Sequence, residues 1–142
     1  MSERRIETYE EFWPFYVREH SNKTSRRLHF VGTTGTILFA AAALLRRKPI
    51  HLLHAAISGY GGAWIGHFFF QKNTPATFKY PLWSLASDFK MYGKIVAGTM
   101  DAEVERVLAE AEAEEARKAA EAQARADEIK HEAPPPQPRP ED

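Results

Sequence analysis

The sequence contains no cysteine at any of its 142 positions. Disulfide bonds and thiolate metal sites are therefore excluded, and a bound metal ion has to be held by histidine or by oxygen ligands. The sequence also has no glycine-rich nucleotide-binding motif and no internal repeat, and we expect no nucleic-acid partner. Because Asp88 is the only acid between Glu19 and Asp101, nothing suggests a Ser-His-Asp triad or a pair of catalytic carboxylates. The N-terminal residues lack an apolar segment before a cleavage site, so we expect no secretory signal peptide.

Charge is distributed unevenly along the chain, although the formal net charge is zero. Of the 19 Lys and Arg residues 13 precede residue 101, together with only 6 of the 19 Asp and Glu residues. The first 100 residues therefore carry a net charge of +7 and the remainder −7. We predict a basic, apolar domain at 1–100, an exposed acidic Ala/Glu-rich helix at 101–132 and a disordered proline-rich tail at 133–142.

Two long apolar runs, 28–45 and 50–70, contain no Lys, Arg, Asp or Glu. At about 1.5 Å per residue, helices of these lengths approach the hydrocarbon thickness of a bilayer, about 30 Å. The connection between the runs is short and basic, so we expect an antiparallel hairpin of two membrane spans. Glycines gather in the second run, where they would let a neighbouring helix approach closely; they are Gly59, Gly61, Gly62 and Gly66.

An amphipathic helix is predicted on either side of the hairpin. Residues 6–20 carry an aromatic face, and Trp and Tyr favour the headgroup level of a membrane, so we expect this helix to be interfacial. Apolar residues recur every three or four positions after Pro81, which predicts a helix on the membrane surface or over the end of the hairpin. The fold class is therefore all-α, an integral membrane hairpin of two spans flanked by interfacial helices. The distribution of basic residues favours cytoplasmic termini.

The predicted hairpin sorts the histidines into two groups. His29 begins the first run and His67 ends the second, so an antiparallel pair places them at one end, where His20 reaches them across a short turn. His51 and His54 begin the second run and belong to the opposite end. Three imidazoles suit iron, zinc or copper, so His20, His29 and His67 are the candidate metal ligands. The alternative is that each is an interfacial or hydrogen-bonded histidine without a metal.

Several short motifs, taken together, carry a resemblance to a known family. They are Glu11-Phe12-Trp13-Pro14-Phe15-Tyr16, Glu19-His20-Ser21-Asn22, Arg26-Arg27-Leu28-His29-Phe30-Val31-Gly32, Gly59-Tyr60, Gly66-His67-Phe68-Phe69-Phe70, Asn73-Thr74-Pro75-Ala76-Thr77-Phe78 and Tyr80-Pro81-Leu82-Trp83-Ser84. Over about Glu10 to Met100 the chain resembles a small membrane-protein family long known only as a domain of unknown function. Its best-understood relative is a fungal endoplasmic-reticulum dioxygenase of 2-hydroxy fatty acids.

The resemblance implies an Fe(II)-dependent membrane enzyme that uses dioxygen to shorten a 2-hydroxy fatty acid by one carbon, as in fatty acid α-oxidation. It implies iron ligation by His20, His29 and His67 and a fatty acid or other lipid as substrate. The membrane would be the inner membrane of a bacterium or the endoplasmic reticulum of a eukaryote. The chain departs from the family pattern at Gln71, where we expect an acid, and a glutamine supplies no carboxylate to a metal.

Two further interpretations of the sequence stay open. The chain is alternatively a non-enzymatic membrane hairpin that binds lipid or scaffolds a protein partner through its acidic tail. A soluble helical bundle is the third interpretation, and it would have to bury both apolar runs. For the enzyme, Arg26 or Arg27 is a candidate partner of the substrate carboxylate, because both precede the first run at the end that carries the three histidines.

Overall fold

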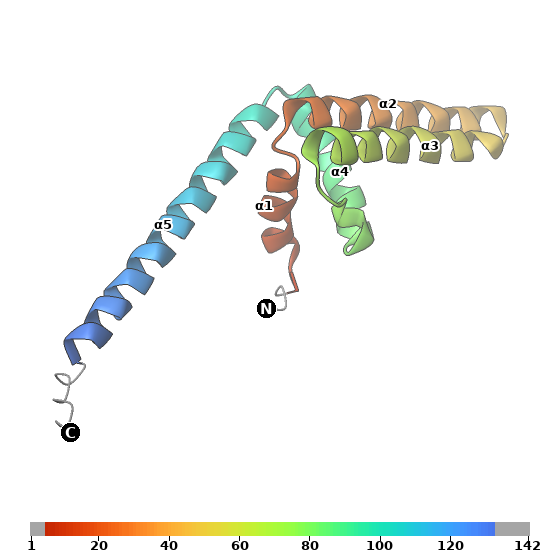
Figure 1. Ribbon diagram of the computed structural model, residues 1–142. Helices are drawn as coiled ribbons and strands as arrows, with labels where there is room; N and C mark the ends of the chain where they lie inside the picture. The colour runs from red at the N-terminus through yellow and green to blue at the C-terminus, as the bar shows by residue number, and fades with distance from the viewer. Residues whose placement is uncertain (1–4, 133–142) are drawn as a thin grey trace, which may run out of the picture. The chain divides into compact units, whose positions relative to one another are not determined.

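The structure, a computed structural model, describes residues 5–132, and all regular secondary structure in this range is helical. The elements are α1 (Tyr9–Glu19), α2 (Lys23–Arg46), α3 (Ile50–Ile65), the π-helix η1 (Gly66–Gln71), the 3-10 helix η2 (Ala76–Phe78), α4 (Pro81–Val96) and α5 (Met100–Glu132) (Figure 1). The all-α prediction is confirmed. The predicted disordered tail at 133–142 lies outside the described residues.

The chain divides into two compact units, the first ending at Val107 and the second beginning at Leu108. The first unit holds α1 to α4 and the first two turns of α5. In the second unit α5 is an exposed helix, whereas the first turns of the helix predicted to be exposed at 101–132 bury Val104 and Val107. Arg117 forms ion pairs with Glu114 and Glu121 along it, which supports a helix without a buried face. The domain boundaries predicted after residues 100 and 132 stay predictions.

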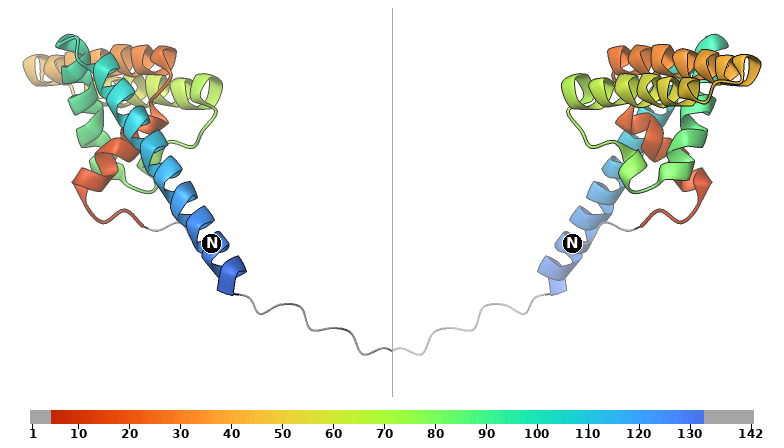
Figure 2. Two further views of the ribbon diagram at one scale, coloured as in Figure 1. Left: turned by 90° about the vertical axis from the view of Figure 1, so that its left-hand side faces the viewer. Right: turned by 90° about the vertical axis from the view of Figure 1, so that its right-hand side faces the viewer.

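Helices α2 and α3 form the predicted antiparallel hairpin and lie side by side in all three views (Figures 1 and 2). Asn22 caps α2 by accepting from the backbone nitrogens of Thr24 and Ser25, which satisfies donors that a helix N-terminus leaves free. The helices are joined by side-chain hydrogen bonds to backbone carbonyls, Thr36 to Ala55 at 2.9 Å and Ser58 to Gly32 at 3.1 Å. These bonds fix the register that sets which residues meet at each end.

Glycine allows the two helices of the hairpin to approach closely. A Cβ atom placed on Gly62 would lie 2.7 Å from the carbonyl oxygen of Leu28 and 3.2 Å from the Cα atom of Gly32. Backbone atoms of α2 cannot move aside without changing the helix itself, so this position requires glycine. A Cβ atom on the neighbouring Gly61 would meet nothing within 4 Å.

Within the described residues, one helix is long and apolar enough to cross a membrane, namely α2. Helix α3 has 16 residues, because the chain widens into the π-helix η1 at Gly66. The hairpin is therefore confirmed, whereas two membrane spans are not. Apolar side chains of both helices are nonetheless exposed on the hairpin; they include Val31, Leu38, Leu44, Leu45, Leu52, Leu53, Ile57 and Ile65.

The aromatic face of α1 is buried, which corrects the prediction of an interfacial helix at this position. Phe12, Trp13, Tyr16 and Val17 form a core with Met91 of α4 and with the first turns of α5; the α5 residues are Met100, Val104 and Val107. The apolar surface that could have faced a membrane is thus covered by two other helices. This core lies beside the end of the hairpin that carries His20, His29 and His67.

Replacing Gly62 by alanine tests the close approach of α2 and α3. We expect Gly62→Ala to lower the free energy of unfolding by about 1–3 kcal/mol, the usual cost of overpacking. Gly61→Ala is the matched control and should be neutral or slightly stabilising, because alanine favours a helix over glycine by about 1 kcal/mol. Thermal unfolding followed by circular dichroism in detergent measures both, and equal midpoints for the two variants would contradict this packing.

Candidate metal centre

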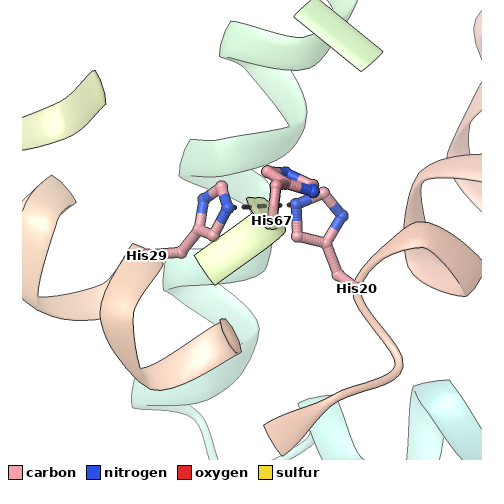
Figure 3. Close-up of side chains that lie close together, drawn as sticks. All are labelled: His20, His29 and His67. Carbon is pink, nitrogen blue, oxygen red and sulfur yellow. Dashed lines mark hydrogen bonds between the residues drawn. The ribbon is translucent and has the colours of Figure 1, made fainter. Parts of the chain in front are cut away.

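Three buried histidines meet at the base of the hairpin (Figure 3). His20 directly follows α1, His29 lies near the start of α2, and His67 lies in η1. One ring nitrogen of each lies within 4.8 Å of the others, and the side chains are only 1%, 4% and 2% exposed. The structure thus brings together the three residues that the sequence offered as metal ligands. That they bind a metal is still a prediction at this point.

Each of the three rings has its Nδ1 atom beside an oxygen acceptor that points away from the centre of the cluster. The acceptors are the carbonyl oxygen of Tyr16 for His20 at 2.7 Å, the carboxylate of Asp88 for His29 at 3.3 Å, and the side-chain oxygen of Asn73 for His67 at 2.7 Å. The amide of Asn73 is oriented by its Nδ2 atom, which donates to Glu19. Metal-bound histidines have the same kind of outer partner, which fixes the ring and its tautomer.

With their Nδ1 atoms beside these acceptors, His20 and His29 face each other through their Nε2 atoms. The Nε2 atoms of His20 and His29 lie 3.2 Å apart, and two lone pairs at this distance repel unless a proton or a cation lies between them. In a neutral ring, a proton on Nε2 would leave the Nδ1 atom of that ring, an acceptor, against another acceptor, so only a doubly protonated ring or a shared cation satisfies both nitrogens. Neighbouring nitrogens on one metal ion, with bonds of about 2.1 Å, are separated by roughly 3.0–3.4 Å, so the observed spacing fits two ligands of one ion.

The protonation state of His20 also suits a metal ligand. Burial lowers the pKa of this histidine well below its usual value, and the positive charges that His29 and His67 would carry lower it further. The imidazole is therefore neutral at pH 7, which is the form that binds metal ions. Neutral imidazole is accepted by iron, zinc, copper and nickel, so the donor set fits Fe(II) without selecting it.

Asp88 and Tyr16 complete the surroundings of the cluster on the side of α4. The ring of Tyr16 stacks on His20 with centroids 4.0 Å apart, and its hydroxyl donates to Asp88. Burial and the neighbouring carboxylate raise the pKa of Tyr16 well above its usual value, so the hydroxyl keeps its proton. Asp88 thus accepts from Tyr16 and holds His29. The isolation of Asp88 in the sequence, as the only acid between Glu19 and Asp101, is the signal that could have pointed to this role.

The π-helix η1 places His67 against α2. A Cβ atom on Gly66 would lie 2.7 Å from the hydroxyl oxygen of Ser25 and 3.3 Å from its Cα atom, so a larger residue would require Ser25 to shift. Whereas His67 is buried, the three phenylalanines that follow it are at least 46% exposed. The element ends at Lys72, which has a left-handed backbone with φ 57°. π-Helical turns are frequent at functional sites because they redirect side chains within a helix.

Gln71 fastens η1 to the loop that carries His20. Its side-chain oxygen accepts from the backbone nitrogen of Asn22 at 3.2 Å, and its nitrogen donates to the hydroxyl of Ser21 at 3.0 Å. Both partners lie directly after His20, so Gln71 supports the cluster through that loop. The acid that the family pattern led us to expect at position 71 is absent, and the carboxylate beside the cluster belongs to Asp88.

Arg26 is occupied by the same loop, which corrects its suggested pairing with a substrate carboxylate. Its Nη1 atom donates to the carbonyl oxygens of His20 at 2.9 Å and Ser21 at 2.6 Å, and its Nη2 atom donates to Asp101 at 2.6 Å. The side chain of Arg26 is only 7% exposed, and its hydrogen bonds stabilise the loop that carries His20.

A cavity of about 220 Å³ adjoins the three histidines. Its wall near the cluster is polar and includes Asp88 and Ser84, whose hydroxyl is buried and makes no hydrogen bond within the described residues. Along α2 and α3 away from the cluster, the wall consists mostly of small and apolar residues together with Thr33 and Thr36, and Leu85 and Phe89 of α4 also line it; the α3 residues are Ala55, Ala56, Gly59, Tyr60, Ala63 and Trp64. The cavity therefore offers a polar end at the histidines and an apolar continuation.

The remaining histidines lie elsewhere, as predicted. His51 and His54 are neighbours at the far end of the hairpin, with ring centroids 5.6 Å apart. His131 is exposed near the end of α5. Across residues 5–132, the cluster of His20, His29 and His67 is the only group of three His, Asp or Glu side chains arranged to hold a metal ion.

Comparison with known proteins adds one finding to this geometry. Residues 6–100 match a family model described as "Mpo1-like: 2-hydroxy-palmitic acid dioxygenase Mpo1-like". The matched segment contains all three histidines of the cluster, together with Asp88 and Asn73. No curated protein and no solved structure gives a significant match.

Alanine at any one of the three clustered histidines should abolish stoichiometric metal binding. We expect His20→Ala, His29→Ala and His67→Ala each to lower the affinity for Fe(II) or Co(II) by at least about a hundredfold, since a removed ligand costs more than a removed outer partner. His54→Ala is the matched control and should bind like the parent. Equilibrium dialysis with elemental analysis measures the bound metal, and full binding by all three variants would rule the cluster out.

Replacing Asp88 by asparagine should weaken metal binding without removing a ligand. Asp88→Asn keeps the shape of the side chain but loses the charge that orients His29, so we expect metal affinity to fall about 10–100-fold. Asp127→Asn makes the same change on the exposed surface of α5 and should have no effect. Competition with a chelator gives the affinities, and parent-like affinity in Asp88→Asn would show that this carboxylate does not support the site.

Proposed function

Because the chain belongs to the Mpo1-like family, we propose that it is a membrane-bound, Fe(II)-dependent dioxygenase that shortens a 2-hydroxy fatty acid by one carbon. The observation that carries the proposal is the convergence of three buried imidazole nitrogens beside a cavity with one polar and one apolar end. A centre with three protein ligands has coordination positions left for substrate and dioxygen.

The proposed reaction balances without a further reductant. A 2-hydroxy fatty acid and one dioxygen molecule give the fatty acid that is one carbon shorter, carbon dioxide and water. The bond between C1 and C2 breaks, and the four electrons that reduce dioxygen all come from the substrate. Bound at the three histidines, Fe(II) supplies the activation of dioxygen that an uncatalysed acid lacks. The chain therefore needs no flavin or nicotinamide site, and the sequence has no glycine motif for one.

The protein's own residues hold and orient the substrate in this proposal. The carboxylate and the 2-hydroxyl lie at the polar end of the cavity, beside the histidines. The hydroxyl of Ser84 lacks a partner among the described residues and lines this cavity, so it is available for a hydrogen bond to the substrate. Buried polar groups that pair only with the correct substrate are a common source of specificity.

Tyr16 and Asp88 keep the side chains around the histidines ordered. The raised pKa of Tyr16 keeps its hydroxyl protonated, and this hydroxyl and Nδ1 of His29 both face the Oδ1 atom of Asp88. The stacked ring of Tyr16 covers His20 and keeps water from that face.

The acyl chain extends from the cavity toward the apolar surface. A volume of about 220 Å³ is below the roughly 300–1,000 Å³ of pockets that enclose drug-sized ligands, so the cavity holds the head and first carbons of a fatty acid. Leu85, Phe89 and Trp64 line the cavity and are also 53%, 44% and 42% exposed. They offer a continuous apolar path from the cavity to the surface.

A bilayer is the proposed surrounding of that surface. At about 1.5 Å per residue, the 24 residues of α2 give a length of roughly 36 Å, enough to cross the hydrocarbon region. We infer that α3 and η1 together form the second span and that both termini are cytoplasmic. The exposed stripe of Leu82, Leu85, Phe89 and Val96 on α4 would lie at the membrane surface. The membrane is the inner membrane in a bacterium or the endoplasmic reticulum in a eukaryote.

An assay with iron-loaded protein tests the proposed activity. Purified protein supplied with Fe(II), dioxygen and 2-hydroxypalmitic acid should form the acid that is one carbon shorter, with one dioxygen consumed per product. His67→Ala should lower turnover at least about a hundredfold, because it removes a ligand of the activating metal, whereas His54→Ala should keep it. Mass spectrometry of the products and an oxygen electrode provide the measurements. Unchanged turnover in His67→Ala, or an iron-loaded parent without product, would overturn the proposal.

A further inference from the structure

The first two turns of α5, outside the segment that matches the family model, contact residues that support the metal centre. The match ends at residue 100, where α5 begins. Met100, Val104 and Val107 of these turns are nevertheless buried in the core with α1 and α4. Two acids between them, Asp101 and Glu103, bond to residues that hold His20.

Asp101 acts on the backbone of His20 through Arg26. One carboxylate oxygen accepts from Nη2 of Arg26 at 2.6 Å, and the other accepts from Nζ of Lys23 at 2.9 Å. The Nη1 atom of the same Arg26 donates to the carbonyl oxygens of His20 and Ser21. A guanidinium that is nearly buried needs partners for its donors and its charge. Asp101 therefore positions the guanidinium of Arg26 for its hydrogen bonds to the carbonyl oxygens of His20 and Ser21.

Glu103 acts on the ring of His20 through two stacked aromatic side chains. It accepts from Nε1 of Trp13 at 2.7 Å, and Trp13 stacks on Tyr16 with an interplanar angle of 14°. Tyr16 in turn stacks on His20 at 4.0 Å. The bond from Trp13, with that from Arg106, lowers the pKa of Glu103 to about 2, so this acceptor is ionised at neutral pH.

The two paths reach different parts of one ligand. Arg26 fixes the carbonyl oxygen of His20, while Tyr16 fixes the face of its ring and also donates to Asp88, the partner of His29. His20 is the C-cap of α1, where its backbone nitrogen donates to the carbonyl oxygen of Val17. Its position therefore depends on Tyr16 of α1 and on Arg26 of α2.

We propose that Asp101 and Glu103 are positioning residues of the metal centre. The start of the acidic helix α5 would then help to orient the ligand His20. This inference rests on the proposed metal site. It assigns a role to the part of the chain that follows the family segment. Neither acid touches the metal or the substrate; both act through the residues that orient His20.

Metal titration of the full-length protein tests the inference. Co(II) reports ligand geometry through its visible absorption, and competition with a chelator gives its affinity, both at a temperature at which circular dichroism shows every variant folded. We expect Asp101→Asn and Glu103→Gln each to lower Co(II) affinity by roughly tenfold, at the lower end of the range for outer partners of ligands, with an altered Co(II) spectrum. Glu105→Gln, an exposed neighbour on the same helix, is the matched control and should resemble the parent.

The outcomes separate this inference from the metal site itself. A parent protein that binds no Co(II) contradicts the metal centre. A parent that binds Co(II), with Asp101→Asn and Glu103→Gln showing the parent's affinity and spectrum, contradicts the inference alone. A loss of equal size in Glu105→Gln would show a general effect of charge and would also overturn it. Trp13→Phe keeps the stacked ring without the donor and should resemble Glu103→Gln, since both remove the same bond.

Discussion

Three imidazole rings converge in a buried cluster beside a cavity, and this constraint governs the rest of the structure. The rings of His20 and His67 are fixed by hydrogen bonds at Nδ1, and Nδ1 of His29 lies 3.3 Å from the carboxylate of Asp88, so none can turn away without losing its partner. Buried polar groups without partners are costly. A cation shared by His20, His29 and His67 relieves the repulsion and uses all three lone pairs, whereas a proton relieves only one pair.

The fold can be understood as the means of holding those rings against their repulsion. The register of the hairpin brings the start of α2 against η1, and glycines at 62 and 66 make the approach possible. His20, which belongs to neither helix of the hairpin, is held by Arg26 and by the stacked ring of Tyr16. The aromatic core of α1, α4 and α5 supports this second set of contacts. Local flexibility at any of these points would separate the ligands.

The sequence was sufficient for the hairpin and for the meeting of the three histidines. Both follow from the length and spacing of two uncharged runs, because an antiparallel pair with a short connection fixes which ends are adjacent. It was not sufficient for Asp88, because a periodic pattern tells which residues share a face of a helix but not which face turns inward. In α4 the polar side, with Ser84 and Ser87, is buried, and several apolar residues are exposed. The burial of the α1 aromatics depended on α5, a partner distant in sequence.

The central claim is that the three Nε2 atoms bind one iron ion. X-ray absorption at the iron edge of Fe(II)-loaded protein measures this directly, because imidazole rings give a recognisable outer-shell scattering. The account predicts three imidazole nitrogens at about 2.1 Å, together with oxygen ligands from solvent or substrate. An iron spectrum with oxygen ligands alone would contradict it.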